Sequence, residues 1–114
     1  MRVDRNADIT RRIAEYCIEI KMTIDRFGDA YDIFSSDRVY QNAVALCVLQ
    51  IGELTTHFSD EFKLEYNEVP WNQIKALRNI VAHNYGKVDK EILWETTTTD
   101  IPALYDYCKK ILNR

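Results

Sequence analysis

Apolar residues recur at every third or fourth position over most of this chain, which is the spacing of amphipathic α-helices. The first such stretch predicts a helix over residues 4–27, where Gly28 is a natural stop. The second stretch predicts a helix that begins behind a cap at Ser36 or Asp37 and ends near Ser59. The first half of the chain therefore predicts two long helices.

Two segments beside these helices lack this period. Residues 29–36 are expected to be a connection from which Tyr31, Ile33 and Phe34 pack on the helices. Residues 62–69 are polar and typical of a turn, so we expect a second connection there.

The second half of the chain predicts three more helices. Pro70 is placed to open a helix that ends near His83, and two further helices are expected over residues 89–97 and 102–113. Pro102 is tolerated only in a first turn, so the last helix requires a cap just before it. The candidates for that cap are Thr98, Thr99 and Asp100. We therefore expect an all-α fold, an up-and-down bundle of four to five helices.

The composition supports that expectation. With 114 residues, the chain is expected to form one domain over residues 1–114 around a single core. Hydrophobic residues make up 46% and charged residues 29%, as in folded globular proteins, and only three glycines and two prolines are available for tight turns. No apolar run is long enough to span a bilayer and the first residues are polar, so we expect a cytoplasmic protein without a membrane segment.

Cysteine and histidine are too sparse to indicate a metal site. Cys17, Cys47 and Cys108 are odd in number, far apart and on apolar stripes, so we interpret them as reduced core residues. The two histidines, His57 and His83, are 26 positions apart and have no Cys-x-x-Cys pair beside them. We therefore expect chemistry without a metal or another cofactor.

The charge balance limits how this protein could bind nucleic acid. A net charge of −3 argues against a broad basic surface, so any contact with RNA must be local. Trp71 and Trp94 could stack on bases, but at their spacings we interpret them as core and interface residues.

One charged residue stands on an apolar stripe. Arg78 lies one turn after Ile74 and one turn before Val81 and Ala82. A buried arginine needs a partner, so Arg78 either pairs inside the bundle, extends its charge to the surface, or faces a cleft or an interface. His83, near the end of the same helix, could simply complement the helix dipole.

The combination of these two residues is more specific than either alone. Residues 77–86 read L-R-N-I-V-A-H-N-Y-G, which places R-N-x-x-x-H-x-Y at Arg78, Asn79, His83 and Tyr85. Around this motif stand, in order, I-G-E at residues 51–53, V-P-W at 69–71, V-D-K-E-I-L-W-E at 88–95 and D-I-P-A-L at 100–104. With this setting the chain resembles, over nearly its whole length, the HEPN-domain proteins, and more narrowly the HepT-type toxins encoded beside a minimal nucleotidyltransferase antitoxin.

The residue types of the motif suit cleavage of RNA without a metal. That reaction needs a base for the 2′-hydroxyl proton, an acid for the leaving 5′-oxygen and positive charge at the phosphate. His83 can accept or donate a proton near neutral pH, and Arg78 can hold a phosphate with its fork of donors. Asn79, one turn before His83, can orient the imidazole or bind the phosphate. Glu53 on the neighbouring helix is either a solvated residue or a carboxylate that orients Arg78 or His83.

The spacing within the motif predicts an oligomer. Five residues along a helix place Arg78 and His83 about 7.5 Å apart along the axis and about 140° apart around it, so one copy converges poorly on one phosphate. Two copies related by a two-fold axis would pool both residue pairs in one cleft. We therefore expect a homodimer with a composite site.

The resemblance also implies a dimer, with RNA cleavage by the matched Arg78 and His83. It further implies that a partner nucleotidyltransferase holds the toxin in check by adenylylating Tyr85, and it leaves open a larger hetero-oligomer with that partner. A group attached to Tyr85 would put negative charge beside Arg78 and His83, in the place meant for the RNA phosphate.

Three hypotheses follow from the sequence. The leading one is the toxin of a toxin–antitoxin system, a metal-independent endoribonuclease that is neutralised by adenylylation (AMPylation). The second is a non-catalytic HEPN module that binds a nucleotide or serves as a scaffold for a nucleotidyltransferase. The third is a purely structural helical bundle.

Overall fold

The computed structural model of this protein describes residues 4–84 and 90–113, and at positions 80 and 82–84 it describes the backbone alone. These described residues form helices and connections, without a β-strand. In chain order the elements are α1 (Arg5–Phe27), α2 (Tyr31–Ser36), α3 (Arg38–Thr55), α4 (Asp60–Glu65), α5 (Trp71–Asn84), α6 (Lys90–Glu95), a π-helical segment (Thr96–Asp100) and α7 (Ile101–Leu112).

The first long helix begins and ends where its sequence signals lie, and the second begins where its signal lies. The side chain of Asp4 accepts a hydrogen bond from the backbone N–H of Ala7 at 3.1 Å and caps α1. Gly28 ends α1 with a φ of 125°, a conformation that side chains with a Cβ rarely adopt. Asp37, one of the two predicted caps, accepts hydrogen bonds from the N–H groups of Val39 and Tyr40 and begins α3. The predicted extent of the first helix, its stop at Gly28 and the predicted cap at Asp37 are confirmed.

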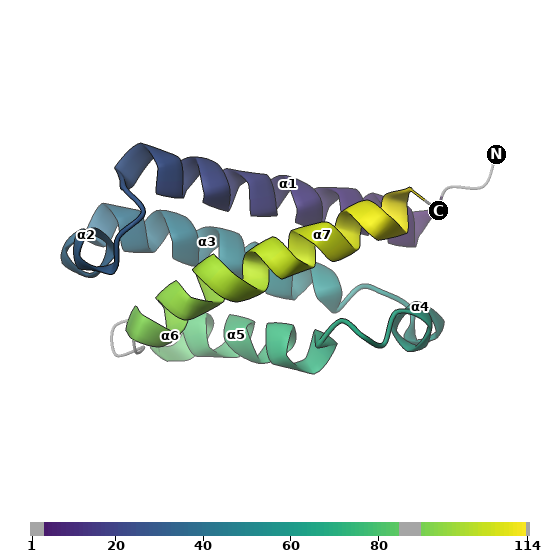
Figure 1. Ribbon diagram of the computed structural model, residues 1–114. Helices are drawn as coiled ribbons and strands as arrows, with labels where there is room; N and C mark the ends of the chain where they lie inside the picture. Colours follow the sequence, from purple (N-terminus) through teal and green to yellow (C-terminus); the bar gives the residue numbers. More distant parts are fainter. Residues whose placement is uncertain (1–3, 85–89, 114) are drawn as a thin grey trace.

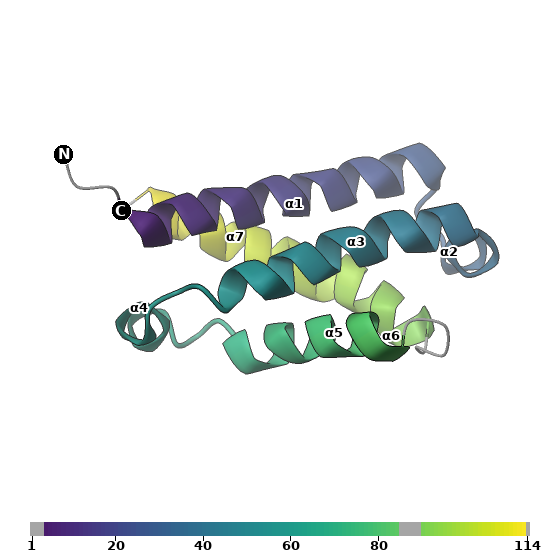
Figure 2. The same cartoon turned by 180° about the vertical axis from the view of Figure 1, so that it is seen from behind.

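Three long helices form a layer that a fourth one covers. Figure 1 shows α1, α3 and α5 as antiparallel neighbours, with α7 crossing one face of this layer. Seen from behind in Figure 2, α3 lies between α1 and α5, and the start of α1 lies beside the end of α7. The buried side chains of these helices form one core, in which Ile13, Phe34, Tyr40 and Val44 are fully covered. The predicted all-α, up-and-down bundle is confirmed.

Both expected connections contain a short helix instead. The connection over residues 29–36 forms α2, because Phe34 is drawn into the core between the rings of Tyr40 and Trp94, each with its ring centroid 5.1 Å away. Ile33 was expected to pack as well, but its side chain is 42% exposed.

The second connection differs because α3 is shorter than predicted. The helix ends at Thr55 and not near Ser59, and the hydroxyl of Thr55 donates to the Gly52 carbonyl at 2.7 Å. Ser59 instead accepts a hydrogen bond from the N–H of Phe62 and caps α4. Residues 62–69 were expected to be connector alone, but their first part lies in this helix.

The break expected before the last helix does not occur. The segment Thr96–Asp100 is a π-helical turn, in which the N–H of Ile101 donates to the carbonyl five residues earlier, so α6 passes into α7 without an interruption. The hydroxyl of Thr97 donates to the Leu93 carbonyl at 2.8 Å and satisfies a backbone acceptor in this wider turn. The cap expected at residues 98–100 is therefore wrong, since the backbone there is already helical.

The two tryptophans pack within the bundle, as interpreted from the sequence. Trp94 lies against Phe34 and Tyr40, and Trp71 lies 5.0 Å from the ring of Phe58. The indole N–H of Trp71 donates to the Tyr66 carbonyl at 3.1 Å. Neither ring is thus presented as a free stacking platform for a base. Among the described helices, none is both long enough and apolar enough to cross a membrane.

The three cysteines are free and buried, as predicted. Burial raises the pKa of the Cys108 thiol to about 12. Burial, followed by the charge of Glu19, raises the pKa of Cys47 to about 11, and burial raises that of Cys17 further still. All three groups are therefore neutral thiols near neutral pH.

This burial predicts slow thiol chemistry. A group with a pKa near 11 is a thiolate in only about one molecule per thousand at pH 8. We expect Ellman's reagent to label the three thiols of the folded protein at least about 100-fold more slowly than those of the protein in denaturant. Rapid labelling of one thiol in the folded protein would contradict the packing of that cysteine.

Candidate functional site

The helix that carries the predicted motif begins directly after Pro70. The carbonyl of Pro70 accepts hydrogen bonds from the N–H groups of Gln73 and Ile74, both at 3.1 Å, so the proline forms the first turn together with α5. Ile74 and Val81 are buried and hold α5 on the bundle. The backbone of all three motif residues up to His83 is helical, as predicted.

Arg78 extends from α5 toward α3 and pairs there with Glu53. Its Nη1 donates to Oε1 of Glu53, and the two side chains are 29% and 45% exposed. Of the three possibilities that the sequence left open for Arg78, the structure favours pairing at the edge of the bundle. The arrangement also joins two segments that lie 25 positions apart in the sequence.

The pairing depends on the residue before Glu53. A Cβ on Gly52 would lie 2.5 Å from the Cβ of Arg78, well inside van der Waals contact. The bare backbone of α3 therefore lets α5 approach until the stem of Arg78 lies against it. Gly52 had no predicted role, although a glycine inside a predicted helix is a signal of close packing.

One donor of Arg78 has no partner among the described residues. Its Nε is buried and finds no hydrogen-bond acceptor there, whereas Nη1 is occupied by Glu53. An unmade hydrogen bond of this kind costs about 1–3 kcal/mol. The guanidinium is thus held in place by Gly52 and Glu53 without all of its donors being used.

The structure describes the other predicted site residues only in part. Asn79 follows Arg78 on α5 and is exposed. His83 belongs to the last turn of α5, but its side chain lies outside the described residues, and Tyr85 lies outside them entirely. The structure therefore brings Arg78 and Glu53 together and places Asn79 and His83 on the same helix as Arg78. Among the described residues, no group of three or more His, Cys, Asp or Glu side chains could hold a metal ion.

Comparisons with known proteins agree with the family resemblance. A family model described as Ribonuclease HepT-like matches residues 8–111. A protein of Caldanaerobacter subterraneus subsp. tengcongensis, named as a candidate RNase, is 32% identical over 97 residues, which cover 84% of this chain and 87% of that protein. The probable ribonuclease HepT of Thermococcus cleftensis is 32% identical over 81 residues, or 71% of this chain and 74% of its own. No solved structure matches this chain.

The close contact at Gly52 predicts that an alanine at this position destabilises the protein. Replacing a glycine inside a helix by alanine ordinarily stabilises it by about 1 kcal/mol. At this position we expect Gly52→Ala to lower the free energy of unfolding by about 1–3 kcal/mol, because the new Cβ pushes Arg78 and α5 away from α3. Urea denaturation measures the difference.

The matched control is Gln50→Ala, which truncates a half-buried residue on the same helix and should change stability by less than about 0.5 kcal/mol. A Gly52→Ala protein as stable as the parent would show that the close approach of α3 and α5 is not needed.

Proposed function

Because this chain belongs to the HepT-like ribonuclease family, we propose that it cleaves RNA and that Arg78 and His83 are its catalytic residues. The observation that carries this proposal is the guanidinium of Arg78, which is partly exposed and fixed between Gly52 and Glu53. With Nη1 paired to Glu53, the side chain of Arg78 is still 29% exposed, so a phosphate could reach it from solvent.

The proposed reaction is an in-line attack of a ribose 2′-oxygen on the adjacent phosphorus. His83 takes the 2′-hydroxyl proton, or its counterpart in a second copy does so, and an imidazolium protonates the departing 5′-oxygen. The products are a 2′,3′-cyclic phosphate and a free 5′-hydroxyl, and the balance of protons needs no metal. Arg78 stabilises the charge on the phosphate, and Glu53 positions Arg78. Asn79 supports His83 or the phosphate.

The proposed site is composite and formed by a homodimer. Val39 and Leu46 are 65% and 57% exposed on α3, and together with Glu53 they follow one another at intervals of seven residues. Seven residues are close to two helical turns, so these side chains share one stripe on the outer face of α3. An exposed apolar stripe that leads to the Arg78–Glu53 pair supports a second copy of this chain as its cover.

The proposed biological role is that of a toxin held in check by a minimal nucleotidyltransferase. In this proposal the partner adenylylates Tyr85, two residues after His83. The added phosphate then competes with RNA for Arg78, since both are anionic ligands of the same guanidinium. The described part of the chain does not include Tyr85, so this step rests on the motif and on the family.

A non-catalytic role remains the second candidate. The same Arg78–Glu53 geometry could hold the phosphate of a nucleotide without cleaving it, and the chain would then serve as a dimeric partner of a nucleotidyltransferase. Replacing His83 by alanine distinguishes the two roles, because cleavage requires proton transfer by His83 and phosphate binding does not.

Cleavage of cellular RNA in EDTA by the purified protein tests the proposal. Intact-mass analysis first has to show that Tyr85 is unmodified. We expect the parent to cleave, His83→Ala to be slower by about 10²- to 10⁴-fold, and Arg78→Lys to be impaired as well, because lysine lacks the fork of donors. His57→Ala, which changes the exposed histidine outside the motif, should retain full activity.

Equal products from unmodified parent and His83→Ala would overturn the catalytic assignment, and the phosphate-binding role would replace it. Cleavage that disappears in EDTA would overturn the metal-independent mechanism.

The stripe on α3 predicts which substitution separates the dimer. We expect Leu46→Glu to sediment as a monomer and to lose RNA cleavage, because it places a charge in the centre of the proposed interface. The matched control is Leu64→Glu on α4, where a leucine is 74% exposed away from the stripe. If Leu46→Glu stays dimeric, or if the parent is a monomer at the concentration of the cleavage assay, the composite site is wrong.

A further inference from the structure

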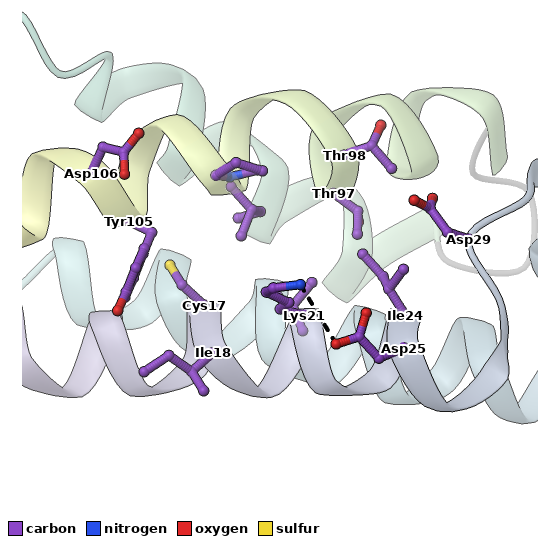
Figure 3. Close-up of a pocket in the computed structure, with 13 residues that line it drawn as sticks. Cys17, Ile18, Lys21, Ile24, Asp25, Asp29, Thr97, Thr98, Tyr105 and Asp106 are labelled. Atoms are coloured by element: carbon purple, nitrogen blue, oxygen red, sulfur yellow. Dashed lines mark ion pairs between the residues drawn. The ribbon is translucent and has the colours of Figure 1, made fainter.

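A groove lies between α1 and α7, on elements that do not carry Arg78. Its volume is about 550 Å³, within the range of about 300–1,000 Å³ that is usual for sites of small ligands. Figure 3 shows the groove bounded by α1 on one side and by the π-helical segment and α7 on the other. Its apolar lining includes Ile18, Ile20, Ile24, Ile101, Pro102 and Tyr105.

The π-helical segment shapes one wall of this groove. Its Thr97 and Thr98 are lining residues, and their hydroxyls donate to the carbonyls of Leu93 and Trp94 at 2.8 and 2.9 Å. These hydroxyl protons are therefore committed to the backbone. Apart from the Tyr105 hydroxyl and the Cys17 thiol, the remaining polar side chains of the lining are charged. π-Helical turns are frequent at functional sites.

The charges of the lining are mostly negative. Lys21 is the single cation among the described lining residues, and its Nζ is 3.5 Å from a carboxylate oxygen of Asp25. Asp29 and Asp106 form no ion pair or hydrogen bond through their carboxylates within the described part of the chain. Burial, and then the charges of Asp29 and Asp25, raise the pKa of nearby Tyr40 to about 12.

The carboxylates stand at the two ends of the groove. Figure 3 shows Asp106 with Tyr105 near Cys17 at one end, and Asp25 with Asp29 at the other. Cys17 and Asp25 are eight residues apart on α1, which corresponds to about 12 Å along the helix. The groove thus offers isoleucine side chains and the Lys21–Asp25 ion pair along its length, with the carboxylates of Asp106 and Asp29 toward its two ends.

We propose that this groove binds a linear aliphatic polyamine, with methylene groups over the isoleucines and with ammonium groups at Asp106 and at Asp29. Such a ligand matches the order of charge and apolar surface along the groove, and each ammonium offers several donors to a carboxylate. A compact metal ion matches it poorly, because the carboxylates are divided between the two ends. The proposal is independent of RNA cleavage, since none of these residues belongs to the α5 motif.

Isothermal titration calorimetry of the full chain with spermidine tests this proposal. We expect one site per chain, and we expect ethylenediamine, which is too short to reach both ends, and Mg²⁺ to bind at least about tenfold more weakly at equal ionic strength. The double variant Asp29→Asn/Asp106→Asn should bind spermidine at least about tenfold more weakly than the parent.

The matched control removes the same charge elsewhere. Glu61→Gln/Glu65→Gln changes two exposed residues of α4, which lies near the other end of α1 from Asp29, and should leave the affinity within about twofold. An effect as large as that of the groove variant would show that only net charge matters.

Chemical shifts of the parent backbone locate the ligand without any substitution. Spermidine should shift the amide signals of residues 17–29 and 97–106 and leave those of α4 unchanged. Absence of binding, equal binding of spermidine and Mg²⁺, or shifts spread over all acidic surfaces would each overturn the proposal.

Discussion

The close approach of α3 and α5 at Gly52 is the constraint on which the candidate site depends. Because Gly52 has no side chain, the stem of Arg78 can lie against the backbone of α3, and its guanidinium then meets Glu53. A larger residue would separate the two helices and leave a charged group without its partner near the edge of the core, which is costly. Gly52, Glu53 and Arg78 therefore combine the close packing of two helices with an ion pair.

The position of α3 in the bundle relates this contact to the proposed composite site. α3 lies between α1 and α5, so its inner residues build the core and its outer stripe remains uncovered. Val39 and Leu46 on that stripe belong to the same helix as Gly52 and Glu53. A partner that covers the stripe would thus be placed beside Arg78 by the geometry of one rigid helix, which is a precise way to assemble a site from two copies.

The other side of the molecule is shaped by the continuous helix from α6 through α7. Its π-helical turn keeps Thr97 and Ile101 directed inward, while α7 crosses the layer of long helices at an angle. This crossing leaves the groove beside α1 with an apolar lining and aspartates at its ends. The protein therefore carries the Arg78–Glu53 ion pair where α5 meets α3, and a groove with a surplus of carboxylates between α1 and α7.

The sequence by itself determined the fold class, the extent of α1 and the start of α5, because apolar periodicity, Asp4, Gly28 and Pro70 act over a few neighbouring residues. It also determined the family, since the spacing of the motif and its flanking segments is a property of the chain alone. Local sequence signals did not predict the structure where contacts with residues distant in the sequence outweigh them. Phe34 makes a helix of an expected connection because the rings of Tyr40 and Trp94 surround it, and the π-helical turn replaces an expected cap.

The same limit applies to the site. The sequence singled out Arg78 and Glu53 but left open whether they meet, because a separation of 25 positions carries no information on the distance between two helices. Only the tertiary structure decided this, through the close contact at Gly52. It also decided that the aspartates of α1 and α7 face one groove, since only the packing of the first helix against the last brings residues from opposite ends of the chain together.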